Sequence, residues 1–215
     1  KMLFAMVGIG LMCALLIVLT YEGTKPIIQK NKAAALEQAI FKVLPGTVTT
    51  SGYYWDGTAF TPLNGAAASG QLVYAGFSES GQLTGFALPA VGLGYAGEIR
   101  VLYGYDPAQE AIVGFYVLES KETPGLGDKI EKDPAFKANF EALSVAVGTD
   151  GNSLKNKITY AKSGEKQNAW EVDGITGATI SSEAVTEALS TSTAEWVPKL
   201  YEAKEAFKPQ TQSHE

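Results

Sequence analysis

The feature that most constrains this chain is an uncharged run of 20 residues near its N-terminal end, Met2 to Tyr21. At about 1.5 Å per residue, a helix of this length crosses a hydrocarbon core of about 30 Å. A cleaved signal peptide is the alternative, but its apolar region is normally shorter and ends in small residues. Here Thr20-Tyr21-Glu22 follows the run. The sequence therefore predicts a retained membrane anchor over residues 1–22.

Charge and residue counts exclude several classes of function. The chain has 17 Lys+Arg against 23 Asp+Glu, which disfavours a nucleic-acid-binding protein. Its one cysteine, Cys13, lies in the apolar run, where we expect it to pack or to face lipid, and its one histidine is His214. A Cys/His zinc site, an internal disulfide and Ser-His-Asp or Cys-His catalysis are thereby excluded. Chemistry must come from carboxylates, Lys, Tyr, hydroxyls or a bound cofactor.

After the anchor, the pattern predicts an α+β fold with an antiparallel sheet and packed helices. We expect a connecting helix over 24–44, with Pro26 in its first turn, and short strands within the loop 47–70. The domains are then an anchor (1–22), a connecting helix (23–46), a folded domain (47–208) and a polar tail (209–215). Alternating residues predict strands at 72–77, 83–88, 99–105 and 111–118, and further helices are expected at 133–143 and 181–207, the last with a kink at Pro198.

Two glycine-rich stretches allow more than one interpretation. Gly92 to Gly97 matches G-x-G-x-x-G, but a strand pattern follows it, so a connection between strands is favoured over a dinucleotide-binding turn. Glu122 to Gly127 combines a proline with two glycines, which fix an unusual backbone path. Amide groups of such a loop can point at an acceptor, and the alternative is an ordinary turn.

The stretch from Asp173 to Thr179 is the most informative, because it leads directly into a predicted helix. Free N–H groups and the helix dipole at such a point favour a phosphate, and a hydroxyl there can be esterified by one. The alternative is a simple helix cap. Four hydroxyl residues crowd this helix start: Thr176, Thr179, Ser181 and Ser182.

These residues carry a resemblance to a known family. Asp173 to Thr179 resembles the flavinylation motif of the FMN-binding domain family, Asp-Gly-x-Ser/Thr-Gly-Ala-Thr. Glu122 to Gly127 resembles the second signature loop of that family, and Gly94 to Gly97 is similar to its glycine-tyrosine stretch. With one membrane helix in front, the set resembles the G subunits of Rnf ion-translocating ferredoxin:NAD oxidoreductases. The C subunits of sodium-translocating NADH:quinone reductases are close relatives.

The resemblance implies FMN bound covalently through a phosphoester to Thr179, attached by a separate flavin transferase that uses FAD and magnesium. Asp173 would help the transferase to recognise or activate the site, and Thr176 stands where many members have Ser. No catalytic residue and no metal ligand is assigned. The implied cofactor-binding residues are Thr179, Asp173, Gly174, Thr176, Gly177, Ala178, Glu122, Thr123, Gly125, Leu126 and Gly127.

Two further residues are hypotheses for the flavin site. Lys162 is a candidate cation near the ring or phosphate, with a solvated surface lysine as the alternative. Tyr95 is a candidate ring neighbour, with a structural aromatic as the alternative.

The resemblance further implies an electron-transfer subunit of an ion-translocating oxidoreductase in the cell membrane. The other Rnf membrane subunits would be its partners, and its folded domain would lie on the periplasmic or outer side. Between Met2 and Leu19 no side chain is ionisable apart from the Cys13 thiol, so this helix alone offers no ion path. The alternatives are the C subunit of the quinone reductase, a membrane-tethered binding module without electron transfer, and an assembly subunit with a vestigial site.

Overall fold

The computed structural model describes residues 2–63 and 72–209, and the chain divides into two compact units, one ending at Gln38 and one beginning at Ala39. The first unit holds most of helix α1 (Met2–Val43), which is long and apolar enough to cross a membrane. The expected connecting helix is not separate, because α1 is continuous and Pro26 lies inside it. A proline in a helix interior removes one backbone hydrogen bond, and α1 continues through this position nevertheless.

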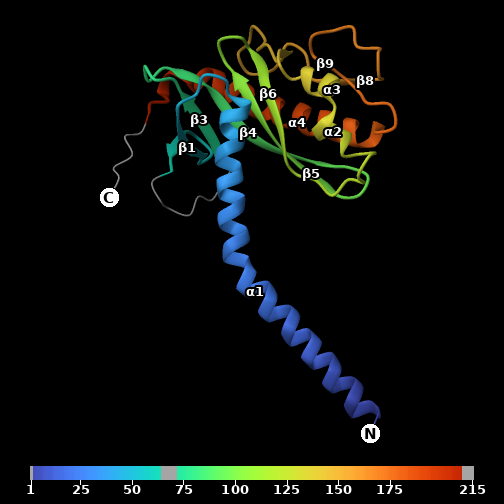
Figure 1. The fold of residues 1–215 in the computed structure, drawn as a ribbon. Helices are drawn as coiled ribbons and strands as arrows, with labels where there is room; N and C mark the ends of the chain where they lie inside the picture. The colour runs from blue at the N-terminus through green and yellow to red at the C-terminus, as the bar shows by residue number, and fades with distance from the viewer. Residues whose placement is uncertain (1, 64–71, 210–215) are drawn as a thin grey trace. The chain divides into compact units, whose positions relative to one another are not determined.

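The second unit is built on a seven-stranded sheet in the order β2-β1-β3-β4-β5-β6-β7, with antiparallel pairing between neighbours (Figure 1). Two short parallel strands form a second sheet. The predicted α+β class is confirmed. The strands are β1 (Thr49–Trp55), β2 (Phe60–Pro62), β3 (Leu72–Phe77), β4 (Leu83–Leu93), β5 (Glu98–Asp106), β6 (Ala111–Glu119), β7 (Leu143–Ser144), β8 (Thr159–Ala161) and β9 (Glu171–Asp173).

Strand β4 is longer than the sequence pattern predicted, because it continues through Pro89 to Leu93. Its described pairing with β3 ends at Ala87, whereas its pairing with β5 continues to Leu93. Pro89 lies opposite Leu102 of β5, so the strand continues through the proline although proline has no backbone N–H. The extra residues carry β4 to the Gly94–Gly97 turn, which Gly94 N–H closes on Gly97 O at 2.9 Å. This stretch connects two strands, as the sequence pattern favoured.

The helices of the second unit are α2 (Lys129–Lys132), α3 (Pro134–Ala138) and α4 (Thr179–Ala203), followed by the 3₁₀ turn η1 (Lys204–Ala206). Helix α4 begins two residues before the predicted start, and Pro198 lies buried inside it. Asp133 begins α3 by accepting hydrogen bonds from Ala135 N–H and Phe136 N–H. This helix is shorter than predicted, since it ends at Ala138 rather than near Leu143.

Helix α4 and the C-terminal end of α1 cover opposite faces of the sheet. The Tyr103 hydroxyl on β5 is hydrogen-bonded to Ser192 of α4 at 2.8 Å. The next residue, Gly104, lies against the backbone of Val43, and a Cβ there would collide with it. Adjacent residues of a strand point to opposite faces, so the sheet is enclosed between the two helices. The apolar core, with Phe86, Leu88 and Val185, lies on the α4 face.

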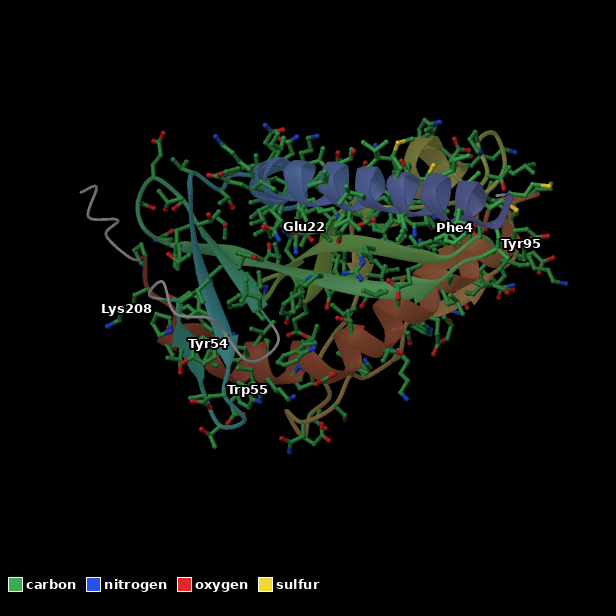
Figure 2. The ribbon with its side chains drawn as sticks, turned by 90° about the horizontal axis from the view of Figure 1, so that it is seen from below. Phe4, Glu22, Tyr54, Trp55, Tyr95 and Lys208 are labelled. Atoms are coloured by element: carbon green, nitrogen blue, oxygen red, sulfur yellow. The ribbon has the colours of Figure 1, made fainter. Side chains whose placement is uncertain are left out.

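The first residues of α4 lie at one end of the domain. Figure 2 shows Tyr95, from the turn between β4 and β5, at the end opposite Tyr54, Trp55 and Lys208. The loop after β6 and the segment after β9 lead to the same end as Tyr95, where residues of all three segments line one cavity. This end of the sheet therefore gathers the three glycine-rich stretches.

Candidate functional site

A cavity of about 340 Å³ is formed where the three stretches meet. This volume lies at the lower end of the range of small-molecule sites, roughly 300–1,000 Å³. The lining joins residues that are far apart in the sequence: Tyr95, Glu122, Thr123, Leu126, Gly127, Gly177, Ala178, Thr179, Ile180 and Ser181. The remaining predicted residues lie elsewhere: Asp173, Gly174 and Thr176 line a neighbouring cavity, and Gly125 and Lys162 line neither.

Glu122 joins the walls of the cavity. Its side chain is 7% exposed, and its two carboxylate oxygens accept hydrogen bonds from different segments. Oε1 accepts from Ala96 N–H at 2.8 Å, and Oε2 accepts from the Ser181 hydroxyl at 2.5 Å. One buried carboxylate therefore holds the β4–β5 turn, its own loop and the first turn of α4 together.

Two glycines make room for this carboxylate. A Cβ on Gly94 would lie 2.5 Å from Glu122 Oε1, and a Cβ on Gly127 would collide with Oε2 of the same side chain. Glu122 and Gly127, two residues of the predicted loop, therefore lie together, because the Glu122 carboxylate packs directly against Gly127. Gly94 lies 28 positions before Glu122 in the sequence (122 − 94). No local pattern therefore indicates that Gly94 makes room for this side chain.

The loop from Glu122 to Gly127 is closed by the next residue, Asp128, which sequence reasoning missed. Asp128 Oδ1 accepts from Gly125 N–H at 2.6 Å, and Leu126 N–H donates to Thr123 O at 3.1 Å. A hydrogen bond from Lys132 lowers the pKa of the Asp128 carboxyl. Gly125 has φ +80°, a conformation that favours glycine. The sequence pattern Gly-x-Gly-Asp, from Gly125 to Asp128, is the feature from which this turn could have been predicted.

The four hydroxyls at the start of α4 have different surroundings. Ser181 and Ser182 are buried, and each is engaged: Ser181 donates to Glu122, and Ser182 donates to Ala178 O at 2.9 Å. Thr176 is exposed on the neighbouring cavity of about 280 Å³, whereas Thr179 is exposed on the first. Ala178 occupies the N-cap position of α4, and no side chain caps the helix. The hydroxyls therefore do not serve as its cap.

Asp173 is held in place by Asn139, a second residue that sequence reasoning missed. The Asn139 side chain accepts from Asp173 N–H at 3.0 Å and donates to Asp173 O at 3.1 Å. The Asp173 carboxylate accepts from Gly164 N–H at 2.7 Å. Asn139 is 6% exposed, so these bonds fix the main chain where the motif begins.

Tyr160 of β8 lies against Gly174, the second residue of the motif. Burial raises the pKa of Tyr160 above its usual 10.0. A Cβ on Gly174 would lie 2.6 Å from the Tyr160 hydroxyl oxygen, so this glycine is required for the approach of the ring. No local pattern pointed to Tyr160, which precedes the motif by 13 residues (173 − 160).

Two lysines lie beside the motif: Lys129, and Lys162, which follows Ala161, whose carbonyl oxygen accepts from Gly174 N–H at 2.9 Å. Lys129 lines the neighbouring cavity, and its Nζ lies 4.0 Å from the position of a Cβ on Gly177. Lys162 is exposed and contributes to neither cavity. Tyr95 lines the first cavity and is 75% exposed.

The arrangement fits an aromatic ligand that carries a phosphate. The cavity wall combines apolar side chains and glycines with a few polar groups, and the N-terminus of α4 presents backbone N–H groups and a positive dipole end beside it. Thr179 places a hydroxyl at that point. Within residues 2–63 and 72–209, no cluster of three or more His, Cys, Asp or Glu is arranged to hold a metal ion.

Comparison with known proteins gives the same result. The FMN-binding domain family matches residues 94–193. The G subunit of the ion-translocating oxidoreductase complex of Methanosarcina acetivorans is 31% identical over 88% of this chain and 89% of that protein. The G subunit of the Na(+)-translocating ferredoxin:NAD(+) oxidoreductase complex of Acetobacterium woodii is 35% identical over 56% of this chain and 52% of that protein.

Solved structures show the same fold. The C subunit of the Na(+)-translocating NADH-quinone reductase from Parabacteroides distasonis superposes with a TM-score of 0.61 and 20% identity. The match covers 80% of this chain and 95% of that structure.

Proposed function

Because the chain belongs to the family of G subunits of ion-translocating oxidoreductase complexes, we propose how its site serves electron transfer. The family is the one that the sequence motifs predicted. The chain is an FMN-binding, electron-transfer subunit of such a complex. Bound FMN supplies reversible uptake and release of electrons, and the protein supplies orientation, local charge and exclusion of water.

The finer part of the proposal is that FMN is attached covalently, through its phosphate, to the Thr179 hydroxyl. The observation that carries it is the difference between the hydroxyls at the start of α4. Ser181 and Ser182 are buried and donate within the protein, whereas Thr179 is exposed on the cavity. Thr176 faces a different cavity. Thr179 is therefore the hydroxyl that an incoming phosphate can reach beside the apolar wall.

Local charge supports a phosphate at this position. The first-turn N–H groups of α4 have no side-chain acceptor, so they and the helix dipole are available to phosphate oxygens. Lys129 adds a positive charge near Gly177. Leu126 and Ile180, which are 54% and 51% exposed, would shield one side of a bound ring from water.

The partners and membrane arrangement complete the proposal. We infer that the other subunits of an Rnf complex exchange electrons with the bound FMN, and that a separate flavin transferase loads it. Helix α1 would anchor the chain in the cell membrane, and its candidate span supports that role. The folded domain would lie on the periplasmic or outer side of the membrane.

The test is Thr179→Val in the full-length chain, coexpressed with the transferase, with Thr176→Val as a matched control. Valine keeps the shape of threonine but lacks the oxygen that bonds phosphorus. Intact mass and flavin fluorescence on a denaturing gel should show one FMN, less one water, on the wild type and on Thr176→Val but not on Thr179→Val. A Thr179→Val protein that still carries this mass would refute the assigned attachment site.

A further inference from the structure

A groove of about 800 Å³ lies between α4 and the end of β4. Residues 89–93 of β4 form one wall, and the face of α4 between residues 180 and 196 forms the other. Strand and helix touch at Gly92, where a Cβ would collide with Ala184 O. Ile180 lines both this groove and the cavity that contains Thr179. The groove therefore adjoins the proposed flavin site.

The helix face that lines the groove is acidic. Glu183, Glu187 and Glu195 line it, and all three are exposed. Arg100, which also lines it, already forms a salt bridge within β5 at 3.0 Å, and Glu195 forms one within α4 at 3.6 Å. Glu183 and Glu187 lie one turn apart and form no salt bridge within residues 2–63 and 72–209. Like charges at this spacing destabilise a helix, so cations from another molecule would be bound favourably here.

Apolar side chains are exposed along the same groove. Val91 and Leu93 of β4 are 50% and 76% exposed, and Ile180 of α4 is 51% exposed. All three belong to the lining. Apolar side chains that gather at one place on a surface, with polar groups around them, mark sites of interaction with other proteins. The groove therefore combines an apolar floor for contact with carboxylates that select a partner by charge.

The cations that would pair with these carboxylates come from outside the chain. Residues 64–71 and 210–215, which the structure does not describe, contain no Lys or Arg. A second copy of the chain would bring the same net charge of −6. Charge complementarity therefore favours a different protein, one that presents basic side chains together with apolar ones.

We propose that this groove is the docking surface for an electron-transfer partner subunit, which places a segment of mixed basic and apolar residues in it. The identity of the partner rests on the proposed function. Lys or Arg side chains of the segment pair with Glu183 and Glu187, and its apolar side chains cover Val91 and Leu93. Because Ile180 belongs to both the groove and the flavin cavity, a partner docked here lies next to the bound FMN.

The first experiment measures binding of a fluorescein-labelled peptide of mixed lysine and valine to the full-length chain in nonionic detergent. Fluorescence anisotropy should show binding that weakens as salt rises from about 0.05 to about 0.5 M, because salt screens exposed charges. Glu187→Gln should weaken binding about two- to fivefold, the effect of one exposed ion pair, and Glu187→Lys should weaken it further. The matched control is Glu202→Gln, which removes an exposed carboxylate of α4 outside the groove and should change nothing.

Two further peptides separate charge from apolar contact. A peptide of lysine and serine should bind more weakly than the lysine–valine peptide, and a peptide of glutamate and valine should not bind. Equal binding of the lysine–valine peptide by wild type and Glu187→Lys would overturn the docking surface. A chain that forms a dimer in detergent, with Glu187→Lys monomeric, would assign the groove to a second copy and overturn the partner.

The second experiment uses the assembled membrane complex. Glu187→Lys should lower the rate at which the FMN of this chain is reduced by about tenfold at low salt, with its FMN content unchanged, whereas Glu202→Lys should not. An unchanged rate would overturn an electron-transfer subunit as the partner. A wild-type chain that holds no FMN would instead refute the proposed function, and the peptide experiment would still test the groove.

Discussion

Removing the Glu122 carboxylate tests whether one buried side chain holds the cavity together. Its oxygens accept from Ala96 N–H at 2.8 Å and from the Ser181 hydroxyl at 2.5 Å, and the residue is 7% exposed. Glu122→Ala leaves the amide without its acceptor and opens a void beneath Gly94 and Gly127. Glu122→Gln keeps the shape and one acceptor oxygen, so the two variants separate charge from packing.

The expected magnitude follows from these two bonds. A hydrogen bond to a charged group contributes about 1.5–3 kcal/mol, so the loss of both predicts about 3–6 kcal/mol for Glu122→Ala. In Glu122→Gln the amide oxygen still accepts from Ala96 N–H, and the Ser181 hydroxyl can rotate to accept from the new amide group. Neutral bonds are roughly half as strong, which predicts about 1–3 kcal/mol for this variant.

The assay is urea unfolding of the full-length chain in detergent, followed by tryptophan fluorescence at neutral pH. Combining Glu122→Gln with Ser181→Ala gives a double-mutant cycle, and residues in contact should couple by about 0.5–3 kcal/mol. A free energy of unfolding for Glu122→Ala within about 0.5 kcal/mol of wild type, the size of an ordinary surface effect, would refute the reasoning. So would a coupling free energy near zero.

Three further predictions concern the loop and the charges around the motif. Gly125→Val should lower the free energy of unfolding by about 1–2 kcal/mol, because φ is +80° at this position. Gly125→Asn should lower it less, because asparagine tolerates a positive φ better than valine. Urea unfolding of both variants distinguishes backbone strain from loss of space. Lys129→Gln should slow flavin attachment about two- to tenfold in the transferase assay, and Lys162→Gln should not. The lowered pKa of Asp128 means that its carboxylate stabilises the fold above its ordinary value of 3.8, and that this contribution is lost as the pH falls through the lower pKa of the folded state. The difference in unfolding free energy between wild type and Asp128→Asn should therefore be constant from pH 7 to pH 5, decline as the pH falls below about 3.8, and disappear only below the lower pKa of the folded state, as urea titrations at each pH will show.

Local patterns predicted the long elements but not the short ones. Alternation of apolar residues located β3 within its bounds, and it located β5 and β6 to within one residue at each end. Strands β7 to β9 have two or three residues each, too few for a period to be recognised. They form because the surrounding chain holds them in place. The sequence pattern ends β4 before Pro89, because a proline usually interrupts a strand and only the pairing with β5 shows that this strand continues.

The sequence by itself determined the apolar helix, the α+β class and the three stretches from which the cavity is built, because each depends on residues close together in the chain. Only the tertiary structure decided that Glu122 bridges Ala96 and Ser181, that Lys129 lines a cavity beside the motif, and that Tyr160 lies against Gly174. These contacts join positions 26 and 59 residues apart in the case of Glu122. Strand register and helix packing set such distances, and neither is encoded in the spacing of residues along one segment.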